Sequence, residues 1–460
     1  MAHHHYLGTV ALLFGVLLPV HATSMREHSD TVLQAIPAVS TVQADSSDTK
    51  EVKENRFSID LNMLTRGELR KGGLSNEKED DDQATFIIER TLLGMSYERE
   101  GLAARLTVQH SGTWGSNKTN SLNIYEAWVH LKTKNGLFAR VGRQNLSYDD
   151  QRIFGADDWA MTAMSHDALK MGYEGHGHKL HLIGAYNQNP ENMSGGTFYS
   201  GGLQPYKAME ALWYHYDVPR FPLGVSAVFM NVGLQNSDLN QDTCTYQQQL
   251  LGTYIHFHPK RLTAEAAFYY QMGKEEHGIP VGAWMASLKA RYEFNDQWAF
   301  YAGYDYLSGD KNFAVPPKGR IGVTHHDKVR GFSSINGSHH KFYGAMDFFY
   351  ITTYVNGFTP GLQNLFAGTT WKPLNRLSVD LAYHYLATAT SLSNADRPLG
   401  HELEAAVSYK LKKDVLLSAG YSFMRGTETM KILKRASGDR QLQWAWIMLV
   451  VSPKIFTTMF

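Results

Sequence analysis

The residues of this sequence that could do chemistry are charged side chains on the polar faces of long segments in which polar and apolar positions alternate. Arg105 and Lys289 lie on such polar faces, and Asp305 lies on another. Guanidinium and ammonium groups that face a common interior attract anions, whereas interleaved carboxylates reduce that attraction. The pattern predicts a mixed-charge interior that passes or binds a hydrophilic solute.

A catalytic or metal centre is not indicated. The sequence holds no G-x-S-x-G, H-E-x-x-H or P-loop motif. Its 21 histidines include pairs such as His176 and His178, or His256 and His258, but a metal site needs three or four converging ligands. The single cysteine, Cys244, excludes a disulfide framework and a Cys-ligated zinc site. We therefore expect no enzyme activity, no cofactor and no metal.

The composition favours a large all-β protein. The 460 residues include 44 Lys and Arg against 44 Asp and Glu, a balance that disfavours a nucleic-acid partner. Beyond the N-terminus no apolar run reaches the ~18 residues of a spanning helix. Aromatic residues nevertheless make up 12% of the chain, and 40 residues are glycine. A transmembrane β-barrel combines these properties.

The N-terminus reads as a targeting signal. Residues 6–20 are apolar and are followed by Val20-His21-Ala22, which predicts a signal peptide over residues 1–22. Its first residues contain histidines instead of the usual Lys or Arg. Residues 23–54 are polar and lack a period, so we expect a flexible segment. Residues 55–460 would then form the barrel.

The rest of the chain alternates with period two, as strands with one apolar and one polar face do. Clear examples are residues 102–109, 124–132, 284–293, 377–385 and 403–410. A soluble sandwich would also alternate. These segments, however, approach the ~10 residues that cross a bilayer at a tilt, and aromatic residues lie at their ends. We expect an antiparallel up-and-down barrel of 18 strands in the outer membrane. Of about nineteen candidate segments, residues 340–352 alternate poorly and are expected to be a loop.

The last strand ends in Phe460, with Phe456 four residues earlier. A C-terminal aromatic on a final strand is typical of barrels that are inserted by an assembly machinery. The expected partners are therefore the outer-membrane lipid and that machinery.

The stretch Tyr125–Trp159 resembles the alginate-export family of outer-membrane porins. The resemblance rests on Gly142-Arg143-Gln144, on Asp149-Asp150, and on Arg152 and Trp159. Further matches are Tyr306–Asp310, followed by Phe332, His339, Tyr343, Gly344 and Asp347, and then His401–Leu403 and Gly420–Ser422. The resemblance covers most of residues 56–460. It implies an 18-stranded outer-membrane barrel that passes a substrate through its lumen, which in the namesake is the polyanion alginate.

Selectivity is expected from charged and polar residues on the interior face. An equally simple interpretation is that the basic residues of the interior face form structural ion pairs with the acidic residues on the same face. Arg143 shares a face with Leu137, Ala139 and Val141, so either a bulge turns it inward or it reaches the headgroups from a strand end. Lys170 belongs to the wider basic set. The expected lining comprises Arg66, Arg105, Arg140, Arg143, Gln144, Asp149, Arg152, Lys289, Arg291, Asp305 and Asp310.

The loop at residues 308–340 is long and is expected on the outer side, where it is either an exposed flap or a gate that folds into the pore. The first functional hypothesis is diffusion of a hydrophilic solute, with an anionic saccharide or polysaccharide as its expected class. The alternative is a plugged barrel that binds partners through its external loops, and the third is a hydrolase with Ser and His on the rim.

Overall fold

The computed structural model describes residues 55–71, 83–156, 159–161, 164–189, 191, 193, 197–199, 204–235, 244–310, 327–334, 336–349, 359–393, 395–434 and 441–460. The expected signal peptide, residues 1–22, and the expected flexible segment, residues 23–54, lie outside the described residues. Part of the long loop, residues 311–326, also lies outside them.

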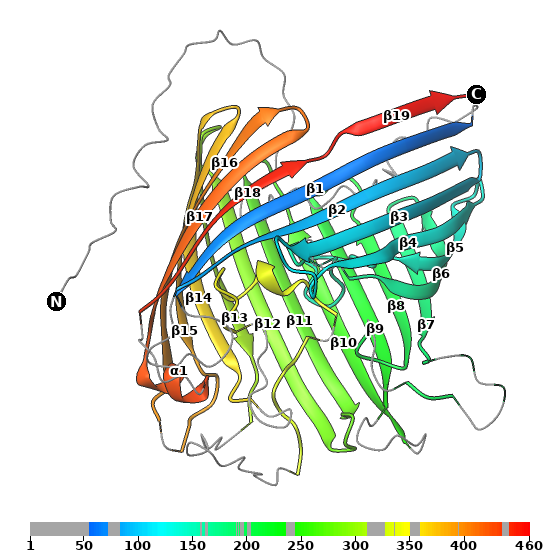
Figure 1. Cartoon of the computed structure of the whole chain (residues 1–460). Helices are drawn as coiled ribbons and strands as arrows, with labels where there is room; N and C mark the ends of the chain where they lie inside the picture. The colour runs from blue at the N-terminus through cyan, green and yellow to red at the C-terminus, as the bar shows by residue number, and fades with distance from the viewer. Residues whose placement is uncertain are drawn as a thin grey trace. The chain divides into compact units, whose positions relative to one another are not determined.

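The described chain contains almost no helix, and its strands form one antiparallel sheet (Figure 1). The strands are β1 (Arg56–Lys71), β2 (Ala84–Arg99), β3 (Leu102–Thr113), β4 (Ser121–Lys132), β5 (Leu137–Gln144), β6 (His166–Gly175), β7 (His178–Tyr186), β8 (Ala208–Asp217), β9 (Leu223–Gln235), β10 (Thr245–Phe257), β11 (Leu262–Lys274), β12 (Pro280–Glu293), β13 (Trp298–Leu307), β14 (Leu362–Leu374), β15 (Leu377–Ala387), β16 (Pro398–Lys412), β17 (Val415–Gly426), β18 (Gln441–Val451) and β19 (Lys454–Met459). Two short helical turns are described, η1 (His339–Lys341) and α1 (Glu428–Leu433). Neither is long and apolar enough to cross a membrane.

The sheet closes on itself. From β1 to β18 each strand pairs with its neighbour in sequence, and β1 pairs both with β2 and with the last two strands. β18 pairs with Met63–Lys71 of β1, whereas β19 pairs with Arg56–Asp60. β18 and β19 therefore follow one another along the same edge and count as one position, interrupted at Pro453, which has no N–H to donate. The predicted 18-stranded barrel is confirmed.

The two faces of the wall differ as the alternation predicts. On β12, Trp284, Leu288 and Tyr292 are exposed on the outer face. Ala283 and Met285, at the alternate positions, are fully buried on the inner face. Apolar side chains on the outside suit a wall in contact with lipid, because the hydrocarbon has no polar partners to offer.

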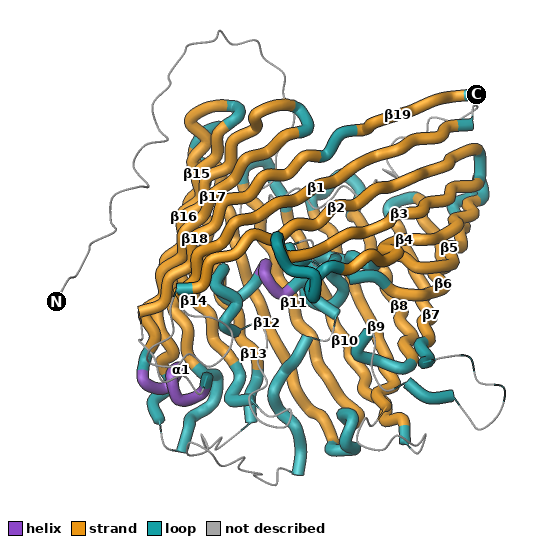
Figure 2. The backbone as a smooth tube through the Cα atoms, viewed as in Figure 1, coloured by secondary structure: helices purple, strands orange, loops and turns teal. Residues whose placement is uncertain are grey.

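The connections differ in length at the two ends of the barrel. Turns such as residues 133–136 and 176–177 join strands at the end where the C-terminus lies, at the top of Figure 1. Residues 145–165 and 308–361 make long connections at the other end. Figure 2 shows loop segments and η1 within the outline of the barrel. Residues 340–349 are loop and 3₁₀ turn, in agreement with the expectation for residues 340–352 as far as they are described.

Gly142 on β5 is held in a conformation that only glycine adopts easily. Its φ is +118°, and a Cβ there would lie 2.2 Å from the carbonyl oxygen of Ala127 on β4. Gly184 on β7 is a matched comparison, since no atom lies within 4 Å of its virtual Cβ. The glycine of the Gly142-Arg143-Gln144 motif is thus required by the close approach of two strands.

We predict that Gly142→Ala lowers the free energy of unfolding by about 1–3 kcal/mol, because the new methyl group must displace backbone and the φ is strained. Gly184→Ala should be neutral or slightly stabilising. Urea unfolding of both variants in detergent, followed by the heat-dependent gel mobility of folded barrels, checks this. Equal midpoints for the two variants would contradict it.

Candidate functional site

Two long connections enter the barrel, and we call residues 145–165 the first inner segment and residues 327–349 the second. The first begins on the wall formed by β8 and β9, where Trp213 Nε1 and Ser226 Oγ donate to Asp149 at 3.0 and 2.5 Å. Further on, Arg66 and Arg90 of β1 and β2 donate to the carbonyl oxygens of residues 159 and 160 at 3.2 and 3.0 Å. Because β9 lies about halfway round the sheet from β1, the segment crosses the lumen.

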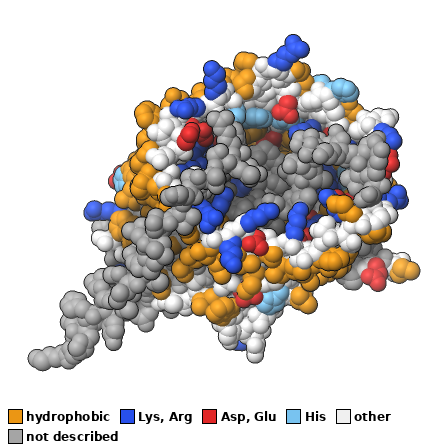
Figure 3. Space-filling model, turned by 90° about the horizontal axis from the view of Figure 1, so that it is seen from above, with side chains coloured by type: hydrophobic (Ala, Val, Ile, Leu, Met, Phe, Trp, Pro, Cys, Tyr) orange, Lys and Arg blue, Asp and Glu red, His pale blue; other side chains and the backbone are white. Residues whose placement is uncertain are grey.

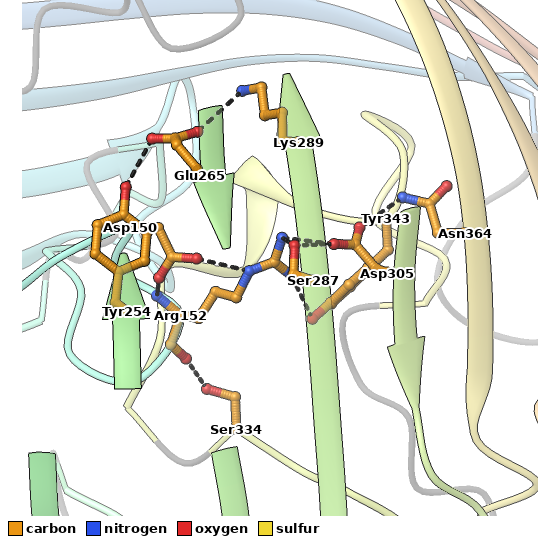
Figure 4. A network of polar contacts seen from close by, with 10 residues as sticks. All are labelled: Asp150, Arg152, Tyr254, Glu265, Ser287, Lys289, Asp305, Ser334, Tyr343 and Asn364. Atoms are coloured by element: carbon orange, nitrogen blue, oxygen red, sulfur yellow. Dashed lines mark hydrogen bonds and ion pairs between the residues drawn. The ribbon is translucent and has the colours of Figure 1, made fainter. Parts of the chain in front are cut away.

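Arg152 is the central contact of the first inner segment (Figure 4). Its Nε donates to Asp150 at 2.8 Å, and its Nη2 donates to Asp305 of β13 at 2.7 Å and to Ser287 of β12 at 3.0 Å. Its Nη1 donates to the hydroxyl of Tyr343, in the second inner segment, at 3.0 Å. One guanidinium thus joins two inner segments and two wall strands.

The surroundings of Arg152 keep it charged. Burial by itself lowers the pKa of the guanidinium, but Asp305, Tyr343 and Asp150 outweigh it, so the net pKa is raised. Burial also raises the pKa of Tyr343 to about 12, so its hydroxyl stays neutral. A buried ion pair of this kind costs desolvation and is stable only when its hydrogen bonds are complete. Here Asn364 donates to the second oxygen of Asp305 at 3.0 Å.

The second inner segment packs on the first inner segment and on strand β16 of the wall. Gly155 N donates to Asn336 O at 2.9 Å, and the ring of Trp159 stacks on His340 with centroids 4.0 Å apart. On the wall, Glu402 of β16 accepts from the backbone N–H of Met346 at 2.8 Å. The two segments form one body inside the barrel that narrows the lumen. Of the expected loop at residues 308–340, the described part from residue 327 onward folds inward.

Several of the expected lining residues are occupied by nearby carboxylates. Arg105 of β3 donates to Asp60 and to Glu126, each at 2.9 Å. Arg66 pairs with Glu68 on its own strand at 2.8 Å, and Lys289 lies 4.0 Å from Glu265. These inward cations form internal ion pairs, which is the structural alternative that the sequence left open.

Other expected residues support the fold around the lumen. The amide of Gln144 donates to the carbonyl oxygen of Ala168 at 2.8 Å, and Arg291 donates to Thr370 at 3.0 Å. Asp310 is fully buried and accepts from the backbone N–H groups of Arg330 and Thr359 at 2.6 and 2.9 Å. It holds the base of the second inner segment.

Arg143 does not face the lumen. β5 pairs with β4 and β6 without a shift of register, so Arg143 stays on the outer face with Val141, near the strand end. Its guanidinium forms two hydrogen bonds to Asp167 of β6, at 2.8 and 2.7 Å. The bulge that could have turned it inward is absent from β5, and Arg143 is therefore excluded from the lining.

Arg140 and Lys170 differ from the paired cations. They are direct partners across β5 and β6, both face the lumen, and both are half-buried. The guanidinium carbon of Arg140 lies 4.1 Å above the ring of Trp128, and the ammonium of Lys170 lies 5.9 Å from the ring centre of Tyr148. Trp128 and Tyr148 were not expected at this site, because neither has a charge or motif that marks it in the sequence.

The sequence matches the model of the family described as alginate export over residues 95–397, which is more than half of the chain. None of the curated proteins matches it.

Solved structures with a similar fold are outer-membrane barrels of low sequence identity. Acinetobacter baumannii OccAB1 is 10% identical, with a TM-score of 0.60 over 89% of this chain and 100% of that chain. Pseudomonas aeruginosa OccK9 (OpdG) is 12% identical, with a TM-score of 0.58 over 86% and 98% of the two chains. OccK2 (OpdF) of the same organism has the same identity and TM-score over 87% and 98%. At this identity the similarity shows the fold alone.

We predict that Arg152→Gln destabilises the protein by about 3–5 kcal/mol, because it leaves Asp305 buried without its cation. The second change in Arg152→Gln/Asp305→Asn should recover part of this loss. Thermal unfolding in detergent measures both. Arg143→Gln is the matched control, since it breaks an exposed ion pair and should cost less than about 1 kcal/mol. Equal losses at the two arginines would show that the buried network does not hold the inner segments.

Proposed function

This chain belongs to the alginate export family and forms a channel in the bacterial outer membrane, and from that premise we propose that an anionic saccharide diffuses through its lumen. The proposal rests on one observation above all: among the described residues, Arg140 and Lys170 face inward without the direct ion pairs to a carboxylate that Arg105 and Arg152 form. Uncompensated cations in a narrow, low-dielectric passage favour anions over cations.

The distribution of charge supports this. Seen from the end with the short turns, Lys and Arg side chains edge the hollow of the barrel, with fewer Asp and Glu between them (Figure 3). The whole chain has no net charge, so any preference for anions comes from where the charged side chains lie along the lumen. The inner segments narrow the path and bring a passing solute close to the wall.

A second candidate is a plugged barrel that binds partners at its outer surface. It is favoured by the crossing of the lumen by the first inner segment, which is fixed at both walls through Asp149 and Arg66. The two candidates differ in one physical property, the passage of ions.

We also propose that residues 1–22 are removed as a signal peptide.

We predict a steady conductance for the refolded protein in a planar bilayer, with a reversal potential in a KCl gradient that indicates chloride preference. Cation preference would keep the channel and remove the anionic solute. A correctly folded but silent barrel would favour the plugged candidate. The heat-dependent gel mobility of the sample is the control for folding.

A further inference from the structure

We propose that residues 38–43 add a strand to the free edge of β19, so that the chain covers its own open edge at the rim of the barrel. The free edge is the side of β19 that faces away from β1. Among the described strands, only β1 pairs with β19. Residues 38–43 lie outside the described residues, in the segment that precedes β1. The proposal goes beyond the passage of a solute and does not depend on it.

The free edge begins where β17 begins on the other side of β18. Val415, the first residue of β17, pairs with Val451, and Ser452 N donates to Asp414 O at 2.9 Å. From Pro453 onward no described strand lies on this side, whereas β1 continues to pair with β19. β19 therefore runs along the end of the barrel that carries the short turns (Figure 1). In barrels of this kind the short turns lie on the periplasmic side.

The register shows which backbone groups point to the free edge. Asn55 and Phe460 exchange two backbone hydrogen bonds, at 3.0 and 2.9 Å. Bonded and non-bonded pairs alternate along an antiparallel ladder, so the N–H and C=O groups of Thr457 and Met459 point away from β1. These are the groups that an added strand would use. The side chain of Met459 is 62% exposed, so the described chain leaves this part of the edge uncovered.

An open edge of this composition is a liability in the periplasm. Ile455 and Met459 are apolar and exposed, and a row of unpaired N–H and C=O groups is a template for other chains. A second copy of this chain does not fit the edge. An antiparallel pair of two β19 edges needs a two-fold axis perpendicular to the sheet, and this axis would turn one barrel upside down in the membrane.

Residues 38–43 have the sequence of a strand that suits this edge. They read Ala-Val-Ser-Thr-Val-Gln, carry no charge and match β19 in length. Val39, Thr41 and Val42 are β-branched, which favours extended backbone. Pro37 precedes them, and proline is tolerated at the start of a strand. No further strand would be needed to cover the edge.

The segment is tethered next to the edge. The described chain begins at Asn55, which pairs with Phe460 at the far end of β19. The linker at residues 44–54 can span up to about 36 Å when extended. The six residues of β19 cover about 20 Å. The linker therefore reaches either end of the edge, and tethering gives the segment an effective concentration of about a millimolar or more.

Charge favours an antiparallel orientation. Lys454 begins β19, and Lys412 and Lys413 lie exposed in the turn beside it. Asp45 and Asp48 follow closely after the segment. An antiparallel strand would end beside Lys454 and bring these two carboxylates close to the three lysines. A parallel strand would place the carboxylates at the opposite end of β19.

The test is hydrogen exchange of the full chain in detergent, read at single amides by fragmentation mass spectrometry. After correction for intrinsic rates, Thr457 and Met459 should exchange at least about tenfold more slowly than Lys413 in its exposed turn. We expect Val39→Pro/Val42→Pro to abolish this protection. Proline has no N–H, and one of the two positions must donate to β19 in either register. Thr458, which bonds to β1, should stay slow.

Ser46→Pro/Thr49→Pro is the matched control, because it places two prolines at the same spacing in the linker. It should leave the exchange of Thr457 and Met459 unchanged. Fast exchange of these amides in the native chain would overturn the proposal. Protection that survives Val39→Pro/Val42→Pro would also overturn it and would show that another chain or the detergent covers the edge.

The orientation is tested by disulfide formation in a Cys244→Ser background, which removes the native thiol. Ala38→Cys/Met459→Cys should form an intramolecular disulfide, because an antiparallel strand brings the two Cα atoms to within about 7 Å. Gln43→Cys/Met459→Cys should not, since residue 43 lies at the other end of the edge. The reverse result would overturn the antiparallel arrangement, and no disulfide in either variant would overturn the pairing itself.

Discussion

The structure depends on one buried ion pair, between Arg152 and Asp305. It ties a long connection to the wall between β12 and β13, and through Tyr343 it ties a second connection to the first. The segments that it ties pack against the inward apolar side chains of Met209, Val228 and other residues of β8 and β9. The contents of the barrel are therefore organised by electrostatics, while their packing is apolar.

The wall was predictable from the sequence because its physical requirement is local. Lipid on one side and the interior on the other impose a period of two, which residues 102–109 and 284–293 show plainly. The same alternation placed Arg143 on the apolar face of its strand, and Arg143 lies on that outer face in the structure. The number of strands around the barrel was also predicted correctly. The last of these strands is divided into β18 and β19 by the break at Pro453.

The interior was less predictable because its contacts join residues far apart in the chain. Arg152 and Asp305 are separated by 153 positions, and no local pattern relates them. On β8, Met209, Ala211 and Trp213 face inward although they are apolar, since the first inner segment covers that part of the wall. The sequence indicated charged residues facing one another but could not show which of them are neutralised.

The joint between β1 and the last two strands has a consequence for how the chain reaches its final form. Asn62 donates to Ser452 across this joint at 2.7 Å, a pair separated by 390 positions. Contacts so distant in the chain carry a large loop-closure entropy and slow the folding of a domain. The cylinder can be sealed only after the entire polypeptide has been synthesised and delivered, so every intermediate before that moment carries two unpaired strand edges.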